Sequence, residues 1–395
     1  MTNYQEYKSN IWKSNLLKFL RQFHLIGAVL VPFFLIWGGI SFFQVMILQS
    51  FFTFSVFLLE VPTGAIADHL GRKISLAAGS FTAGLAAFTY SLYPNFWLFM
   101  FAEFLFALAL ALISGADQAM VYDSLKEMKK EKTSKKVLGT WNSSGLAALG
   151  IAAPVGSLIA VTLGLEWTFR LMAIPMVMAG LLAFTLKEPH TRLKHKKKKY
   201  METLKEGFAY FKNHKQLKLL ALDYATIAVL AFFIIWVYQV VLTSLNFPLG
   251  YFGWVHAGIV FGEIIVLNNF VRLDRIFRGK KNYLLFSALL TGLGFLTLAL
   301  VRNIYVAVPT IILIASFGMT RKFLFHNYMN KFIESHHRAT VLSTISMLYM
   351  FVMAIGNLLW GRLVDWNLHI TLGIIGTLII VLTLISKTNS RNNKY

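Results

Sequence analysis

Long apolar runs separated by short polar segments fill almost all of the 395 residues. Many of the runs hold roughly 18 or more apolar residues, the length that lets an α-helix cross the hydrocarbon core of a bilayer. We therefore predict an all-α membrane protein with about twelve spanning helices and no large soluble domain. The predicted limits are 17–38, 41–67, 73–93, 95–124, 137–163, 166–187, 216–244, 250–271, 281–301, 303–331, 338–364 and 367–387.

Basic residues divide the polar segments into two alternating sets. Of the 38 lysine and arginine residues, about 35 fall in one set, and the other holds only Arg170, Arg302 and Arg362. Short loops rich in lysine and arginine remain in the cytoplasm when a membrane protein inserts. We therefore predict a multi-pass protein of the cell membrane with both termini in the cytoplasm, as an even number of spans requires.

The composition agrees with a membrane protein and argues against several other classes. The chain is 57% hydrophobic and only 14% charged, whereas soluble domains carry roughly a quarter charged residues. The formal net charge of +21 follows from the basic loops, which we expect to contact anionic lipid headgroups rather than nucleic acid.

Motifs for bond-making chemistry are missing from the sequence. Cysteine is absent, so disulfides and thiol chemistry are excluded. No phosphate-binding Gly-x-x-x-x-Gly-Lys motif occurs, and we find no metal-ligand cluster or nucleophile–base pair with convincing spacing. We therefore expect neither enzyme activity nor a cofactor, and we expect the chain to work as a monomer.

A basic segment near the middle separates two halves with equal numbers of predicted helices. We predict one six-helix bundle at 1–187 and a second at 216–395, joined by a polybasic linker at 188–215. The lysines of this linker either fix the topology and contact lipid, or form a regulatory or partner-binding site.

Two short patterns of the first half recur in the second half, with offsets of 204 and 206 residues. The second copy of the polar pattern has Phe277 where the first has Gly71. Agreeing offsets favour a parallel duplication, and such repeats hold binding sites near the bilayer midplane. The matched segments are Val137-Leu138-Gly139-Thr140 with Val341-Leu342-Ser343-Thr344, and Asp68/Arg72 with Asp274/Arg278.

The loop between the second and third spans carries a recognisable motif. Its pattern, Gly64-x-x-x-Asp68-x-x-Gly71-Arg72-Lys73, resembles the signature of the major facilitator superfamily. Two further stretches, 114–125 and 338–343, resemble a bacterial, drug-efflux-like branch of that family. The resemblance implies two six-helix bundles facing each other across a central cavity, with transport by rocker-switch alternating access.

The residues of this motif suit a conformational gate. Gly64 and Gly71 allow close helix approach and a turn, and the guanidinium of Arg72 can bridge two carboxylates. The resemblance implies that Asp68, Arg72 and Asp123 form a cluster that holds the cytoplasmic face closed. The alternative is that these charges, Lys73 included, only fix the topology.

Carboxylates inside predicted spans are candidates for proton or substrate binding, because a buried charge is costly in a membrane. Glu103 and Asp117 lie 14 residues apart in the fourth span, which places them on nearly the same face of a continuous helix. The alternatives are a packing role for Asp117 with Gly115, and a Glu103 that is satisfied by a neighbouring helix.

The second half offers two more buried acids. Glu263 is a candidate proton carrier in the eighth span, with His256 seven residues earlier on the same face. Asp223, in the seventh span, has a candidate basic partner in Arg321 or Lys322. We expect Arg21 and His24, at the end of the first span, to extend to the membrane surface.

Transport of a small molecule is the function that these features favour. Many related exporters carry an arginine in the fourth span, which is absent here, and the glycine motif of their fifth span is degenerate. Buried acids without a buried base favour a neutral or cationic amphipathic substrate. We predict a proton-coupled efflux antiporter driven by the proton gradient; the alternatives are an uptake permease for a metabolite, and a non-transporting membrane sensor or scaffold.

Overall fold

The computed structural model describes most of the chain, and in the parts that it describes every regular element is a helix. The described residues are 3–189, 209–211, 214, 217–218, 221, 223–329, 333 and 338–385. Within them, the side chains of 3, 60–62, 64–70, 326–328 and 338–340 are not described. The described residues fall into two compact units, one within Met1–Lys196 and Leu249–Ala257, the other within Lys197–Pro248 and Gly258–Tyr395.

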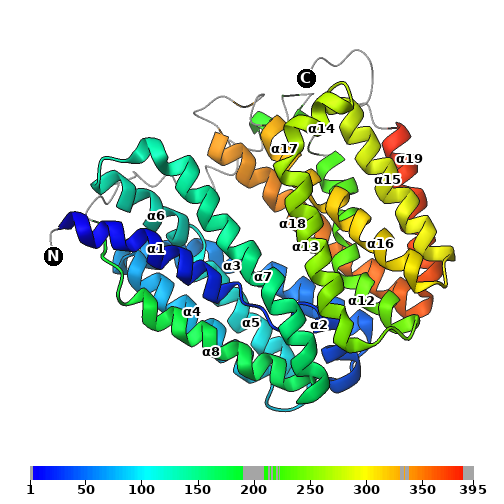
Figure 1. Ribbon diagram of the computed structural model, residues 1–395, viewed down its shortest axis with the longest axis horizontal. Coiled ribbons are helices and arrows are strands. Elements are labelled where there is room, and N and C mark those ends of the chain that lie inside the picture. The colour runs from blue at the N-terminus through cyan, green and yellow to red at the C-terminus, as the bar shows by residue number, and fades with distance from the viewer. Residues whose placement is uncertain are drawn as a thin grey trace. The chain divides into compact units, whose positions relative to one another are not determined.

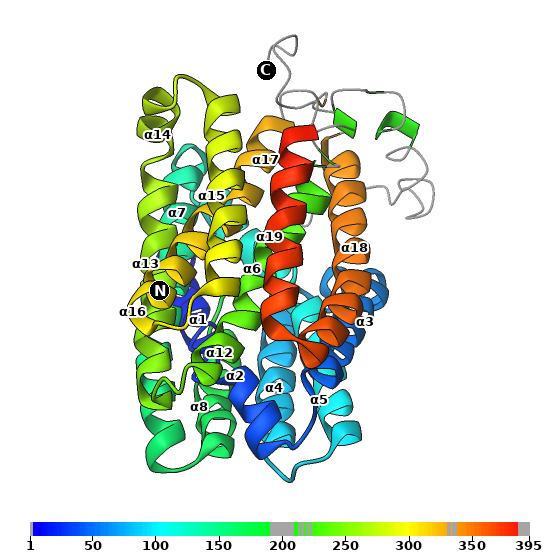
Figure 2. The ribbon, with the colours of Figure 1, turned by 90° about the vertical axis from the view of Figure 1, so that its right-hand side faces the viewer.

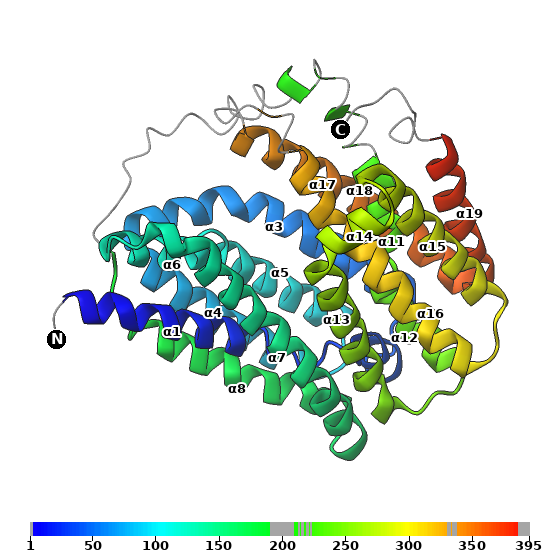
Figure 3. The same cartoon turned by 45° about the horizontal axis from the view of Figure 1, so that its top comes forward.

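The first unit is built mainly from long helices that run side by side (Figure 1, blue to green). Helix α4 packs against α5 and α8, and α1 packs against α6, α7 and α8, as Figure 3 also shows. Its elements are α1 (Asn3–Arg21), α2 (Leu30–Pro32), the π-helix η1 (Phe33–Trp37), α3 (Phe42–Leu70), α4 (Arg72–Tyr90), α5 (Phe96–Ile113), α6 (Ala116–Glu127), the short 3₁₀-helix η2 (Glu131–Thr133), α7 (Ser134–Thr162) and α8 (Leu165–Ala183).

The second unit repeats this plan, and in it α15 packs along α19, as Figure 2 shows. Its described elements are the π-helix η3 (Tyr224–Ala228), α11 (Val229–Phe232), α12 (Ile234–Ser244), α14 (Phe270–Ile276), α15 (Lys280–Leu300), α16 (Ile304–Ile314), the π-helix η5 (Ala315–Met319), α17 (Arg321–Met329), α18 (Arg338–Trp366) and α19 (Leu368–Ile385). The 3₁₀-helix η4 (Leu249–Tyr251) and the start of α13 (Phe252–Asn268) belong to the first unit.

Ten helical segments of the described chain are long and apolar enough to cross a membrane. They coincide with every predicted span except the first and the third. The third is present as the 19-residue helix α4, which begins with two basic residues and carries serines and threonines between its apolar positions. The first span differs from the prediction: α1 begins at Asn3 rather than at residue 17, and its helix stops at Arg21.

Glycines allow the closest helix contacts in both units. A Cβ atom on Gly79 of α4 would lie 2.9 Å from the carbonyl oxygen of Ala109 in α5, and one on Gly180 of α8 would lie 2.8 Å from the ring of Phe81. In the second unit, a Cβ on Gly292 of α15 would lie 3.0 Å from the carbonyl oxygen of Gly376 in α19. Small residues are the usual means of close helix packing in membranes.

Helices α4 and α15 begin with the same glycine turn, although the two glycines do not align when the sequences of the two halves are compared. Gly71 caps α4 with φ 96° and ψ 159°, and Gly279 caps α15 with φ 122° and ψ 157°. The expectation that the second copy lacks this glycine is therefore wrong. The turn glycine is kept two positions beyond Phe277, because only glycine adopts this backbone conformation without strain.

Candidate functional site

A polar cluster surrounds the start of α4 in the first unit. The carboxylate of Glu188 accepts hydrogen bonds from the backbone N–H groups of Arg72 and Lys73, both at 2.9 Å. These donors have no partner within the helix, and the positive end of the helix dipole favours a carboxylate there. The absence of a side chain on Gly71 matters here, since a Cβ would lie 3.0 Å from the Glu188 carboxyl carbon.

Arg72 connects α4 to α6. Its guanidinium forms an ion pair with Asp123, which is 3% exposed, and donates a 2.7 Å hydrogen bond to the carbonyl oxygen of Ala119. Two of the three predicted gate residues are therefore in contact. The side chains of Gly64 and Asp68 lie outside the described residues, so the part assigned to Asp68 stays a prediction.

The side chain of Asn10 links α1 by hydrogen bonds to the segment that follows α8. It is fully buried, and its side-chain amide donates hydrogen bonds to Ser124 Oγ at 2.9 Å and to the carbonyl oxygen of Lys187 at 2.8 Å. The backbone N–H of Lys187 donates to Asn10 Oδ1 at 2.9 Å. These hydrogen bonds hold the backbone just before the linker predicted at 188–215. Residues 190–208 of that linker lie outside the described part of the chain.

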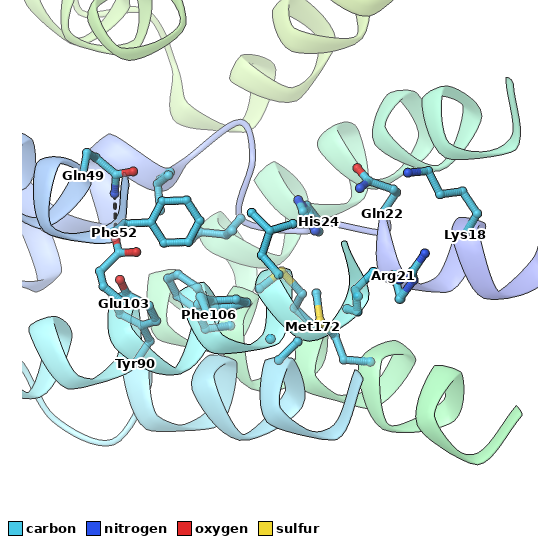
Figure 4. Close-up of a pocket in the computed structure, with 18 of the residues that line it drawn as sticks. Lys18, Arg21, Gln22, His24, Gln49, Phe52, Tyr90, Glu103, Phe106 and Met172 are labelled. Atoms are coloured by element: carbon cyan, nitrogen blue, oxygen red, sulfur yellow. Dashed lines mark hydrogen bonds between the residues drawn. The ribbon is translucent and has the colours of Figure 1, made fainter. Parts of the chain in front are cut away.

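A partly open cavity of about 380 Å³ is lined by residues of the first unit. Its middle is apolar, and its polar side chains gather in two groups, as Figure 4 shows. One group contains Glu103, and the other contains Asp117, so both predicted intramembrane acids of the fourth span line the same cavity. The polar lining residues are Lys18, Arg21, Gln22, His24 and Asp117 in one group, and Gln49, Tyr90 and Glu103 in the other.

Glu103 is held by residues of three helices. It lies on α5 and is 5% exposed, and its carboxylate accepts a 2.6 Å hydrogen bond from Gln49 Nε2 of α3. The Tyr90 hydroxyl, from α4, bonds the same carboxyl group, and both side chains flank it in Figure 4. Among the described residues no ion pair involves Glu103, so hydrogen bonds alone satisfy it.

Asp117 instead forms an ion pair. Its Oδ2 atom lies 3.0 Å from Nη2 of Arg21, whose side chain is only 6% exposed. The expectation that Arg21 extends to the membrane surface is therefore wrong. It fails because α1 continues 18 residues before Arg21 as a polar, lysine-containing helix, which leaves Arg21 packed within the bundle.

The fourth span is not one continuous helix. Gly115, with φ 75°, separates α5 from α6, so the shared face inferred for Glu103 and Asp117 does not follow from helix geometry. The cavity nevertheless receives both side chains. Asp117 occupies the first turn of α6 and also accepts a 2.7 Å hydrogen bond from the backbone N–H of Gln118.

The second unit contains its own buried ion pair. Asp223 lies 3.6 Å from Nη2 of Arg321, which is 1% exposed. Arg321 Nη1 also donates to the Leu284 carbonyl oxygen at 2.5 Å and to Ser287 Oγ at 2.6 Å. Of the two predicted partners, Asp223 thus pairs with Arg321.

Glu263 lies on α13 within the second unit and is partly buried, and it interacts electrostatically with Lys322 of α17. His256, on the same helix, falls in the first unit beside Gly27.

Sequence reasoning missed Gln49, Tyr90, Glu188 and Arg21 as partners of the charged residues. Three of them carry no signal in a single sequence, because polar residues at span ends and single tyrosines are common in membrane helices. The pairing of Arg21 with Asp117 could not be predicted either, because the break at Gly115 that places Asp117 beside Arg21 is visible only in the backbone, where φ is 75°.

Solved structures share this fold over nearly the whole chain. A crystal structure of the nucleoside transporter NupG matches with a TM-score of 0.80 at 15% identity, covering 97% of this chain and all of that one. A bacterial homolog of the human lysosomal transporter Spinster matches with a TM-score of 0.73 at 14% identity, covering 100% and 99%. A D-xylose-proton symporter matches with a TM-score of 0.71 at 12% identity, covering 99% and 100%. A search of curated proteins found no match.

The fold defines the class: this is a multi-pass, all-helical membrane protein with the architecture of a transporter. The family profile described as "Major Facilitator Superfamily" matches residues 19–347, and the chain belongs to that family. The predicted fold class and family are therefore confirmed. Proteins of this family and fold are transporters that bind small molecules, not enzymes.

Proposed function

We propose that this protein is a proton-coupled secondary transporter that exports a small amphipathic molecule by alternating access. The observation that carries the proposal concerns Glu103, a carboxyl group that lies in a cavity of the first unit. Among the described residues it is hydrogen-bonded by Gln49 and Tyr90 and forms no ion pair. A carboxyl group without a basic partner inside a membrane is suited to bind and release a proton.

The cavity around Glu103 supports a small-molecule cargo. Its volume of about 380 Å³ falls in the range of small-molecule sites, which are mostly apolar with a few polar groups. Aromatic and methionine side chains, including Phe52, Phe106, Met172 and Met176, form its apolar wall. Methionine adapts its shape readily, which favours cargoes of varied outline.

Export is the direction that the sequence resemblance favours, and uptake is the second candidate. The D-xylose-proton symporter among the structural neighbours shows that the fold also suits proton-linked symport. In our proposal the protein is a monomer of the cell membrane with cytoplasmic termini, and its basic loops contact anionic lipids. The Arg72–Asp123 pair, with Asp68, closes the cytoplasmic side.

The proposal is tested with proteoliposomes that contain the pH-sensitive dye pyranine. Members of a compound panel are added outside, and proton movement through the purified protein is recorded for each. We expect at least one compound to move protons in wild-type vesicles. Glu103→Gln should reduce this signal at least tenfold and remove the pH dependence of cargo binding, since the amide mimics the neutral acid at every pH.

Glu166→Gln is the matched control, because Glu166 lies in the first turn of α8 and is not among the residues that line the cavity. It should behave like the wild type. Proton movement that persists unchanged in Glu103→Gln would contradict the role of Glu103. The sign of the proton movement that accompanies cargo entry distinguishes exchange from symport.

A further inference from the structure

One end of the cavity carries more positive than negative charge. Lys18 and Arg21 of α1 and Asp117 of α6 all line this end. Among the described lining residues the only other acid is Glu103, which belongs to the polar group at the other end of the cavity. Two bases therefore face one carboxylate in an apolar setting.

Arg21 has hydrogen-bonding capacity that the protein does not use. Its guanidinium, which comprises Nε, Nη1 and Nη2, supplies five N–H donors, and Nη2 is paired with Asp117. Both Nε and Nη1 are buried without a hydrogen-bond partner among the described residues. Buried donors of this kind are rare in proteins unless water, an ion or a ligand meets them.

Lys18 strengthens the imbalance. Its ammonium lies 4.3 Å from the ring centroid of Trp141. It interacts electrostatically with Asp117, but among the described residues no carboxylate lies within ion-pair distance of it, and Asp117 is already paired with Arg21. Gly145 of α7 leaves room for the lysine stem, since a Cβ there would lie 3.0 Å from Lys18 Cε. The aromatic ring stabilises the cation but does not neutralise it.

We propose that this end of the cavity binds the acidic group of a small organic anion, with Arg21 as the principal contact and Lys18 as the second cation. Arginine presents paired donors that match a carboxylate. Asp117 holds the guanidinium from one side and leaves Nε and Nη1 for the ligand. The apolar body of the ligand lies along Phe106, Met172 and Met176, which line the neighbouring wall.

The inference refines the cargo class of the proposed function and rests on it. From the sequence we expected a cationic or neutral cargo, because no base was recognised inside the spans. Arg21 is such a buried base, so an anionic cargo is no longer disfavoured. Glu103, at the other end of the cavity, keeps its separate role with the proton.

Three probes of one shape and different charge test the site. They are 2-naphthoate, the neutral 2-naphthamide and the cationic 2-naphthylmethylammonium, and their binding to the purified full-length protein is measured by isothermal titration calorimetry. We expect naphthoate to bind at least tenfold more tightly than either of the others. Naphthoate that binds no more tightly than the amide would overturn the proposal.

Two variants, one double and one single, keep the test valid if either fails to fold. The double variant Arg21→Gln/Asp117→Asn removes both charges of the pair together, and it should weaken naphthoate binding at least tenfold while leaving naphthamide binding unchanged. Asp117→Asn alone increases the excess positive charge and should tighten naphthoate binding. The control is Lys8→Gln, which removes an exposed charge of the same helix outside the cavity and should change nothing.

Failure of this inference is distinguishable from failure of the proposed function. If naphthoate binding is weak or insensitive to the Arg21 substitution while proton movement still depends on Glu103, only the anion site is wrong. If proton movement is absent, the anion site is still judged by the calorimetry alone.

Discussion

Arg21 and Arg321 show how this protein keeps charges inside its bundles. Each is almost fully buried, and each is paired with an aspartate from another span, Asp117 and Asp223 respectively. A buried ion pair contributes little net stability, but removal of one partner leaves an uncompensated charge and is strongly destabilising. The pairs therefore hold each bundle in one arrangement more than they add stability.

Arg321→Met should destabilise the protein by about 3–5 kcal/mol, because it leaves Asp223 buried without its base. The double variant Arg321→Met/Asp223→Leu should recover most of that loss, since apolar groups of similar volume replace both charges. Unfolding in detergent, followed by tryptophan fluorescence, measures both. Arg302→Met, at an exposed arginine, should change stability by less than about 0.5 kcal/mol; a double variant as unstable as the single one would refute this account.

Helix breaks occur at corresponding spans of the two halves. The first, fourth, seventh and tenth spans are interrupted: a break follows Arg21, Gly115 divides the fourth span, and π-helices occupy the seventh and tenth. The buried ion pairs lie at these breaks. The polarity is reversed, because the base is on the first span and the acid on the fourth, whereas the acid is on the seventh and the base on the tenth.

This arrangement supports the internal duplication. Asp223 follows Arg21 by 202 residues, and Arg321 follows Asp117 by 204, close to the offsets of the sequence patterns. Discontinuous helices commonly carry the binding groups of transporters, since their breaks free backbone groups and orient dipoles. The residues of the candidate site therefore lie on the elements of the fold that are suited to bind a substrate.

Gly115→Ala tests the break in the fourth span. Gly115 has φ 75° and open space around its Cβ position, so alanine meets no atom and suffers only backbone strain of about 1–2 kcal/mol. We expect destabilisation of that size and weaker cargo binding, measured in parallel by unfolding and calorimetry. Gly139→Ala, in the second turn of α7 and also in open space, should be neutral or stabilising by up to about 1 kcal/mol. Equal effects of the two substitutions would show that the break is unimportant.

Over the whole molecule, hydrophobic run length and basic loops were enough to predict the fold. Membrane spans need long apolar segments whatever their partners, and the signature motif placed the chain in its family. Backbone breaks were not predicted, because the apolar pattern continues through Gly115 and through the π-helical turns. The partners of charged groups were predicted only for Asp223 and, through the family resemblance, for Arg72 with Asp123. Contacts such as Gln49 with Glu103 depend on helix packing rather than on local sequence.

The central claim is that this protein couples a small-molecule cargo to protons through Glu103. The most direct test loads proteoliposomes with the compound that gives the strongest pyranine signal and imposes a pH gradient across their membrane. The account predicts that the compound moves against its own concentration gradient, that a protonophore abolishes this movement, and that Glu103→Gln protein supports only downhill exchange. Uphill movement that survives the protonophore or the Glu103→Gln substitution would contradict it.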